Sequence, residues 1–417
     1  MMEGWKEYKF SEIADFPPKI KMEKGAEYPF VLMDEVDAGF KYVRASFTKN
    51  YNGSGAKFEN GDTLFARITP SLENGKIAQI KDINKPAFGS TEFFVFRGIK
   101  DVSDSDFIYY LSKTDWFRQN AINSFVGASG RQRADAKFVG KTILTVPLLP
   151  SQQKIAKILS SYDDLIENNL QRIKLLEEMA QNTYEDWFAF RKIDDEIIKD
   201  SEIDFVPLEE LIQNYMNGGW GKEVEEGGYI TPAYVIRGTD MPDISNGYFD
   251  RLPLRFHTKG NFLERQLTNG DIIIEMSNGN IDNVGRSFYF NGDFIKQIQY
   301  PAICASFCKM LRPKNIEFSF IIDSHLKYIY HTNRMLVYKS QAANGINNFR
   351  FEDLITDELL MIPKGELLSR FVDSLKPKYQ LISNFRRQIK LLREARDILL
   401  PRLMTGMIDV EKLELEL

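Results

Sequence analysis

The sequence predicts an α+β protein in which two mixed α/β domains are separated by two long antiparallel, coiled-coil-like helices, as a pseudo-twofold internal repeat. Three observations predict this fold class. A segment near the middle of the chain recurs near its end, both copies have helical periodicity, and each follows a region with the same order of strand and turn signals. With 417 residues, 43% of them hydrophobic, the chain is long enough for two or three packed domains.

The repeat relates residues 144–178 to residues 360–394 at a shift of 216, without a gap. Ordinary composition gives roughly two identities in such a window, whereas eleven are present. The identical pairs are Leu144 and Leu360, Pro147 and Pro363, Leu159 and Leu375, Leu165 and Leu381, Ile166 and Ile382, Asn168 and Asn384, Ile173 and Ile389, Lys174 and Lys390, Leu175 and Leu391, Leu176 and Leu392, and Glu178 and Glu394.

Both copies have apolar residues at spacings of three and four, which predicts a narrow helical seam with charged outer faces. Near Asn169 the seam is polar, and at Pro377 the second helix could kink or restart. Antiparallel pairing is the natural arrangement, because the chain runs out along the first helix and returns along the second. The expected seam residues are Ile158, Leu165, Ile173, Leu176, Leu375, Ile382, Ile389 and Leu392.

This organisation gives four segments. Residues 1–149 and 193–364 form the two domains, and residues 150–192 and 365–417 contain the two helices. Each domain has an Asn-Gly-Asp turn before a strand, a strand ending in Arg, a helix-like stretch, a polar glycine loop and a strand ending in Pro. In order, these signals lie at 60–65, 86–97, 106–122, 127–133 and 143–147, and again at 269–274, 301–312, 318–334, 343–350 and 359–363. A shared scaffold with different loops is typical of two modules that do one job on two targets.

Composition narrows the class of protein. The net charge is −5, so any nucleic-acid binding must use local basic charge or charge from a partner. No apolar run is long enough for a transmembrane helix, and residues 1–10 are too polar for a secretory signal, so we expect a cytoplasmic protein without membrane contact. Cys304 and Cys308 are expected to be small buried residues near a strand, and the three histidines show no metal-ligand pattern.

Sequence signals of catalysis are weak. Val139-Gly140-Lys141-Thr142 resembles the end of a P-loop, but Asp135 stands where that loop needs a glycine. An Asn-Pro-Pro-aromatic or Asp-Pro-Pro-aromatic tetrapeptide, the usual site for methylating a base amino group, is absent, and so is a glycine-rich nucleotide fingerprint after a strand. These features together favour a binding protein over an enzyme.

Two stretches carry a family resemblance. TILTVPLLPSQQKIAKILSSYDDLIENNLQRIKLLEEMAQNTYEDWF (142–188) resembles the central conserved region of type I restriction-modification specificity subunits, and LISNFRRQIKLLREARDILLPRLMTGMID (381–409) resembles their C-terminal conserved region. The Ala-Lys-Ile-Leu-Ser pattern and the Leu-Leu-x-Arg-Leu-Met-x-Gly pattern are the specific parts. One departure is residues 362–366, which lack the Pro-Ser-Gln-Gln start found at 150–153.

The resemblance implies that each domain is a target recognition domain that reads half of an asymmetric, bipartite site in double-stranded DNA. It implies two copies of a methyltransferase subunit, which bind around the helices and methylate adenine N6 with S-adenosylmethionine. A restriction subunit that uses ATP and Mg can join them, while this chain holds no cofactor, no metal and no catalytic residue. A helix of about 30 residues spans roughly 45 Å, or about 13 base pairs, which suits a ruler for the unread gap.

Recognition loops diverge, so the candidate reading residues follow from side-chain chemistry. Arginine suits guanine and phosphate, and glutamine and asparagine suit adenine. The first-domain candidates are Arg131, Gln132, Arg133 and Lys137 in the loop, with Lys141 beyond it, and Arg67, Thr69 and Lys76 after the Asn-Gly-Asp strand. The second-domain candidates are Asn344, Asn347, Asn348 and Arg350 in the loop, and Ser277, Asn278 and Asn280 after the strand. A solvated loop and a plain turn are the simpler readings of these segments.

Two other functions stay open at this point. The chain is an alternative candidate for a helical adaptor that joins two protein partners without DNA specificity. A stand-alone methyltransferase or nuclease with an unfamiliar motif order is the enzyme alternative. If the chain confers no sequence-dependent methylation on a cognate methyltransferase partner, the adaptor is favoured over the specificity subunit. Methyl transfer by the purified chain alone would support the enzyme.

Overall fold

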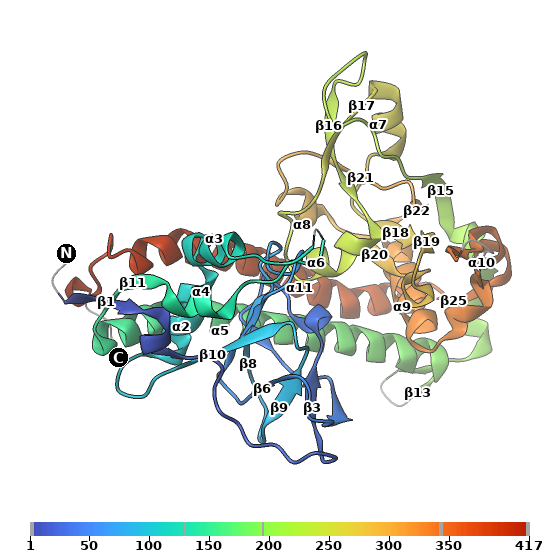
Figure 1. Ribbon diagram of the computed structural model, residues 1–417. Coiled ribbons are helices and arrows are strands. Elements are labelled where there is room, and N and C mark those ends of the chain that lie inside the picture. Colours follow the sequence, from blue (N-terminus) through green and yellow to red (C-terminus); the bar gives the residue numbers. More distant parts are fainter. Residues whose placement is uncertain (1–3, 129, 194–195, 342–344, 414–417) are drawn as a thin grey trace. The chain divides into compact units, whose positions relative to one another are not determined.

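The computed structural model of the chain describes residues 4–128, 130–193, 196–341 and 345–413 (Figure 1). The chain divides into two compact units: unit 1 comprises Met1–Glu167 and Leu391–Leu417, and unit 2 comprises Asn168–Lys390. Two long helices, α5 (Leu149–Tyr184) and α11 (Glu366–Met404), run through both units, so each unit has a β-rich part and a portion of each helix. The predicted α+β class with two long helices is confirmed.

Unit 1 contains two sheets and one isolated strand pair. The five-stranded sheet has the order β2-β10-β7-β8-β4, the four-stranded sheet has the order β5-β3-β9-β6, and β1 pairs antiparallel with β11. The strands are β1 (Trp5–Lys9), β2 (Ala14–Asp15), β3 (Glu27–Val31), β4 (Tyr42–Val43), β5 (Phe47–Asn50), β6 (Ala56–Phe58), β7 (Thr63–Ala66), β8 (Ile77–Ile80), β9 (Ala87–Gly89), β10 (Phe93–Gly98) and β11 (Ile143–Pro147). The helices are α1 (Phe10–Ile13), α2 (Ser105–Lys113), α3 (Asp115–Asn123) and α4 (Ala136–Lys141).

Local sequence explains two boundaries in unit 1. Gly61 has a positive φ of 86° at the Asn-Gly-Asp turn, a conformation that glycine adopts without a steric penalty, and β7 begins two residues later. The single helical stretch expected over 106–122 is in fact two helices. Thr114 ends α2 in an extended conformation and accepts a hydrogen bond from the Phe117 backbone N–H, so it also caps α3.

Unit 2 repeats this plan with more strands. Its four-stranded sheet has the order β15-β22-β18-β20, and two three-stranded sheets have the orders β17-β16-β21 and β19-β24-β23. The strands are β12 (Lys192–Ile193), β13 (Glu196–Ile197), β14 (Ile203–Pro207), β15 (Ile212–Asn217), β16 (Thr231–Ile236), β17 (Leu254–His257), β18 (Asp271–Glu275), β19 (Ser277–Asn278), β20 (Ser287–Phe290), β21 (Ala302–Cys304), β22 (Cys308–Pro313), β23 (Lys339–Gln341), β24 (Asn347–Phe349) and β25 (Leu359–Pro363). The helices are α6 (Met241–Ser245), α7 (Lys259–Arg265), α8 (Gly292–Ile295), α9 (Ile316–His331) and α10 (Phe351–Asp357).

Strand pairing shows the repeat within the β-rich parts. In unit 1, β7 lies antiparallel between β10 and β8, and in unit 2, β18 lies antiparallel between β22 and β20. The parallel pair β3–β9 corresponds to β16–β21, and the pair β1–β11 corresponds to β14–β25. The weak sequence similarity of the two domains therefore reflects one shared scaffold.

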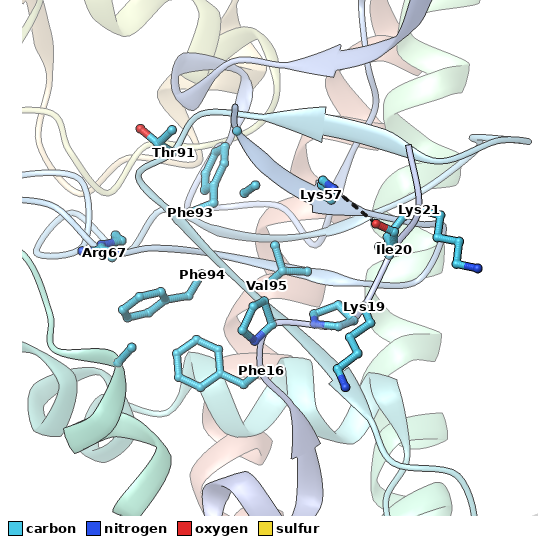
Figure 2. A pocket seen from close by; sticks show the side chains of 15 residues that line it. Phe16, Lys19, Ile20, Lys21, Lys57, Arg67, Thr91, Phe93, Phe94 and Val95 are labelled. Atoms are coloured by element: carbon cyan, nitrogen blue, oxygen red, sulfur yellow. Dashed lines mark hydrogen bonds between the residues drawn. The ribbon is translucent and has the colours of Figure 1, made fainter. Parts of the chain in front are cut away.

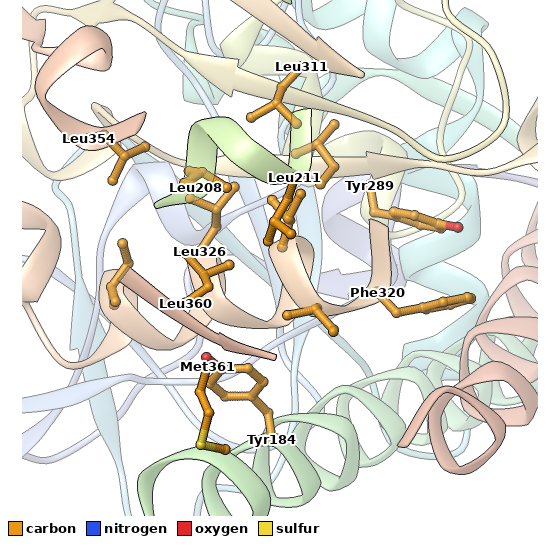
Figure 3. Packing of buried hydrophobic residues seen from close by; sticks show 14 of the residues in the cluster. Tyr184, Leu208, Leu211, Tyr289, Leu311, Phe320, Leu326, Leu354, Leu360 and Met361 are labelled. Atoms are coloured by element: carbon orange, nitrogen blue, oxygen red, sulfur yellow. The ribbon is translucent and has the colours of Figure 1, made fainter. Parts of the chain in front are cut away.

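Each unit buries its portion of the long helices in its own hydrophobic core. In unit 2, Tyr184 of α5 joins the cluster that contains Leu326 of α9 and Leu360 of β25 (Figure 3). In unit 1, Leu159 of α5 and Leu403 of α11 belong to the same cluster. Since a fully buried large apolar side chain contributes about 1.5–3 kcal/mol, the helices are held by the domain cores as well as by each other.

The buried stripe of the helices differs from the predicted seam at one position. Ile173, Leu375, Ile382 and Ile389 are buried, and Ile158, Leu176 and Leu392 are half-buried. Leu165 is 53% exposed, and Ile166, which is 2% exposed, takes its place. The buried residues Leu159, Ile166, Ile173 and Ala180 of α5 follow one another at intervals of seven, and Leu165 precedes Ile166 by one residue, which turns its side chain by about 100° away from the buried face.

Polar residues occupy the stripe where the two helices meet. In unit 1, Arg396 Nη1 donates to Asp163 Oδ1 at 2.5 Å, and both side chains are less than 10% exposed. In unit 2, Asn169 Nδ2 donates to Gln388 Oε1 at 3.1 Å. From the first pair to the second, the residue number rises along α5 and falls along α11, which confirms antiparallel packing. Helix α11 is continuous through Pro377.

Candidate nucleic-acid interface

In unit 1 the structure brings together candidates that lie far apart in the sequence. The backbone N–H of Ala134 donates to the Arg67 carbonyl at 2.8 Å, and the N–H of Thr69 donates to the Gln132 carbonyl at 3.0 Å. On the other side, the Arg67 N–H donates to the Glu92 carbonyl at 2.9 Å. We call the segments 67–69, 91–92 and 131–134 layer 1.

Glu92 is the residue of layer 1 that the sequence reasoning missed. Its carboxylate accepts two hydrogen bonds from Arg133, at 2.9 Å from Nε and 2.6 Å from Nη2, and lies 3.9 Å from Arg67 Nε. The hydrogen bond to Glu92 raises the pKa of Arg133. The Arg67 guanidinium lies over the Phe94 ring, 4.9 Å from its centroid. Glu92 therefore occupies the Nε–Nη2 edge of the Arg133 guanidinium, and Nη1 donates to the Arg131 carbonyl at 3.3 Å, so the direction of this guanidinium is fixed by the fold.

The other basic candidates of unit 1 differ in availability. Arg131, Lys137 and Lys141 are exposed, and no hydrogen bond or ion pair of their side chains to another described residue is found. The Lys76 ammonium is used within the fold, because it donates to the Met33 carbonyl at 2.9 Å and lies 3.6 Å from Asp34. Lys76 is thus turned away from layer 1.

In unit 2 the two groups of candidates are neighbours in one small sheet. Strand β19 pairs antiparallel with β24, so that Ser277 lies opposite Asn348 and Asn278 lies opposite Asn347. Backbone hydrogen bonds extend the arrangement, since the Phe349 N–H donates to the Met276 carbonyl at 2.8 Å. We call the segments 276–280, 305–307 and 347–349 layer 2. Asn344 lies outside the described residues.

Most of the amides in layer 2 hold the loop together. Asn347 is buried, and its Nδ2 donates to the Asn278 and Gly279 carbonyls at 3.2 and 3.0 Å. Asn278 Nδ2 donates to Glu275 at 2.7 Å, and Asn280 Oδ1 accepts from the Asp282 N–H at 3.0 Å. Asn348 and Asn280 are exposed and Ser277 is half-buried, so these three side chains have the accessible polar groups.

Arg350 belongs to the same loop but is engaged within the fold. Its guanidinium lies 2.7 Å from Asp353 and also donates to the Val337 carbonyl. These contacts orient the loop that leads into α10, so we assign Arg350 a supporting place beside layer 2.

The two layers are built from the same hydrogen bonds. Met276 N–H donates to the Phe307 carbonyl at 2.8 Å, as Arg67 N–H donates to Glu92. The position of Glu92 is therefore taken in layer 2 by Phe307, which is 69% exposed. Both residues directly precede a strand whose next-to-last residue is arginine, β10 and β22, and this position is the signal that could have found them.

The two cysteines and His325 are buried. Cys304 and Cys308 are free and buried, and burial raises the pKa of the Cys304 thiol to about 12. His325 Nδ1 contacts the Tyr184 hydroxyl at 2.6 Å and its Nε2 contacts Glu358 at 3.0 Å, inside the core of unit 2. Within the described ranges, no group of three or more potential ligands is placed to hold a metal ion, and no helix is long and apolar enough to cross a membrane.

Comparisons with known proteins agree with this architecture. A family model described as the type I restriction modification DNA specificity domain matches residues 2–178. The type I restriction enzyme MjaIX specificity subunit of Methanocaldococcus jannaschii is 28% identical over 405 residues, which are 95% of this chain and 90% of the relative. The HindI specificity subunit of Haemophilus influenzae is 28% identical over 197 residues, which are 45% of this chain and 41% of that relative.

A solved structure shares the fold. The crystal structure of a type I restriction-modification system S subunit from M. genitalium matches with a TM-score of 0.52 and 16% sequence identity, over 96% of both chains. Two copies of one layered scaffold on a pair of long helices define a two-module binding subunit. Over 95% of its length the chain is similar to a type I restriction-modification specificity subunit, and residues 2–178 match the DNA specificity domain of that family.

Proposed function

We propose that the chain reads a bipartite, asymmetric site in double-stranded DNA, with layer 1 at one half and layer 2 at the other. One observation carries this proposal: both layers have the same backbone hydrogen bonds but different side chains. Equal scaffolds present equal surfaces, whereas unlike side chains select unlike bases. An adaptor that binds two identical partners has no need of such differences.

Side-chain chemistry suggests how each half is read. In layer 1, Arg133 is held as a fork by Glu92, and Arg131 and Gln132 are adjacent, which suits guanine, phosphate and adenine contacts. In layer 2, Asn348, Asn280 and Ser277 have the accessible polar groups, and Phe307 offers an apolar contact such as a thymine methyl needs. Asn278, Asn347 and Arg350 hold the loop in place through their hydrogen bonds, and Lys137 of the first domain supplies phosphate contact.

The helices are proposed to set the unread gap and to carry the partners. Residues 1–149 and 193–364 act as target recognition domains, and 150–192 and 365–417 act as spacer segments. Two methyltransferase subunits bind around the spacer and methylate adenine N6 with their own S-adenosylmethionine. Restriction subunits with ATP and Mg can join this complex, which acts in the cytoplasm. The net charge of −5 supports a partner that supplies much of the phosphate neutralisation.

A methylome tests the proposal. The chain is co-expressed with its neighbouring methyltransferase subunit, and host DNA is sequenced with detection of modified bases, beside a strain that carries the methyltransferase alone. We expect a split adenine-containing motif that appears only when the chain is present. A stable complex that yields no new motif would contradict DNA reading and favour the adaptor.

A further inference from the structure

Unit 1 contains a cavity of about 650 Å³ beside layer 1, and Arg67 lines both. Its walls combine aromatic rings with cations (Figure 2). Phe16 and Phe94 meet edge to face, with ring centroids 4.8 Å apart and an angle of 77° between the ring planes. Figure 2 shows Arg67 on one side of this apolar floor and Lys19 and Lys21 on the other.

The charge around the cavity has one sign. Of the fifteen residues that line it, three are lysines and one is an arginine, and none is acidic. Lys19 and Lys21 are exposed, and no partner for their ammonium groups is found within the described part of the chain. Lys57 makes one long hydrogen bond, 3.4 Å to the Ile20 carbonyl, and so keeps donors for a ligand. Arg67 Nε has no hydrogen-bond partner, and the carboxylate of Glu92 in layer 1 lies 3.9 Å from it.

Few ligands match an aromatic floor with a basic rim. A neutral aliphatic ligand leaves the cations unused, and an inorganic anion leaves the aromatic floor unused. A nucleotide uses both, because its base stacks on aromatic rings and its phosphate pairs with lysine. The volume lies within the range of small-ligand sites, about 300–1,000 Å³.

We propose that this cavity binds a single nucleotide, with the base against Phe16 and Phe94 and the phosphate at the lysines. The nucleotide is either free or an unpaired residue of the bound DNA, since both offer the same chemistry. The inference deepens the proposed function at layer 1, because the cavity shares Arg67 with it. Binding of a nucleotide in the cavity does not depend on whether layer 1 reads a base pair.

Binding to the purified full-length chain tests the inference. The probes are 5′-dAMP, deoxyadenosine and inorganic phosphate, measured by titration calorimetry. The variants are Lys19→Gln with Lys21→Gln, which lowers the charge of the rim, and Ala136→Trp at an exposed lining position, which fills the cavity. The control is Lys6→Gln with Lys100→Gln, an equal change in charge at two exposed positions outside the cavity.

We expect saturable binding of 5′-dAMP and about tenfold weaker binding of deoxyadenosine and of inorganic phosphate. Both cavity variants should bind 5′-dAMP about tenfold more weakly than the natural chain, and the control variant should bind it equally well. No saturable binding, or binding that both variants leave unchanged, would overturn the inference. A duplex with one unpaired adenine distinguishes the sources: competition with 5′-dAMP indicates DNA, and simultaneous binding indicates a free nucleotide. A split motif in the methylome together with no 5′-dAMP binding removes the cavity site and leaves the proposed function intact.

Discussion

Tyr110 of α2 donates a hydrogen bond to Asp163 of α5 at 2.5 Å. In unit 2 the direction is exchanged, since Tyr379 of α11 donates to Asp323 of α9, also at 2.5 Å. Asp163 and Tyr379 are 216 residues apart, the spacing of the sequence repeat. The repeat thus keeps a Tyr–Asp contact between a domain helix and a long helix, while the carboxylate moves from one partner to the other.

Asp163→Asn should destabilise the chain by roughly 3 kcal/mol, because it leaves the buried Arg396 guanidinium without its main counter-charge. The loss stays at the low end because Asp397 still accepts from Arg396 at 2.9 Å. Denaturant unfolding measures the change. The control is Asp373→Asn at an exposed position of α11, for which we expect a change within about 0.5 kcal/mol. Equal stability of the two variants would show that the pair contributes nothing.

Ile166→Ala and Leu165→Ala form a matched pair at adjacent positions of α5. Ile166→Ala should lower the free energy of unfolding by about 2–4 kcal/mol, because the change removes buried methyl groups and leaves a cavity. Leu165→Ala should lower the free energy of unfolding by less than about 0.5 kcal/mol, because Leu165 is exposed. Thermal or urea unfolding distinguishes the two variants, and the reverse order would support the predicted seam through Leu165 instead.

Stability should fall as the pH drops below about 6.5. Burial lowers the pKa of His325 below its ordinary value of 6.5, so the unfolded chain takes up a proton in a range where the folded chain does not. His257 shifts in the same direction for the same reason. The free energy of unfolding, measured from about pH 5 to 7.5, should therefore depend less on pH in His325→Gln than in the natural chain. His331→Gln, at an exposed position, is the control, and equal slopes in all three would contradict the expectation.

Arg131→Ala and Asn348→Ala should each affect one half of the recognised site. A lost base contact costs about 1–3 kcal/mol of discrimination, so each variant should weaken or relax only its own half-site. Methylome sequencing of the assembled complex reads both halves at once. A change in both halves, or unchanged affinity and specificity for Arg131→Ala, would refute the assignment of layer 1.

Glu92→Gln should separate specificity from affinity. The change releases the Arg133 fork and removes a negative charge, so discrimination at the first half-site should fall while non-specific DNA binding tightens. The salt dependence of non-specific binding should steepen by about one counterion. Glu73→Gln, exposed in the same domain, should tighten non-specific binding without loss of discrimination. Loss of discrimination in both variants would mean that Glu92 acts only through its charge.

The sequence by itself determined the repeat, the two long helices, their antiparallel pairing and the family resemblance. These features depend on local periodicity and on short motifs that adjacent residues carry, so they can be read without coordinates. The sequence also indicated which loops to examine.

Only the tertiary structure decided how those loops are used. It joined Ser277 to Asn348 and Thr69 to Gln132, it turned Lys76 toward Met33, and it placed Glu92 on Arg133. It also showed that Ile166, and not Leu165, is buried, and that Asp163 pairs with Arg396. The reason is physical: these contacts join residues far apart in the chain, and a one-residue error in helical phase turns a side chain by about 100°. Local patterns name the candidates, and packing selects among them.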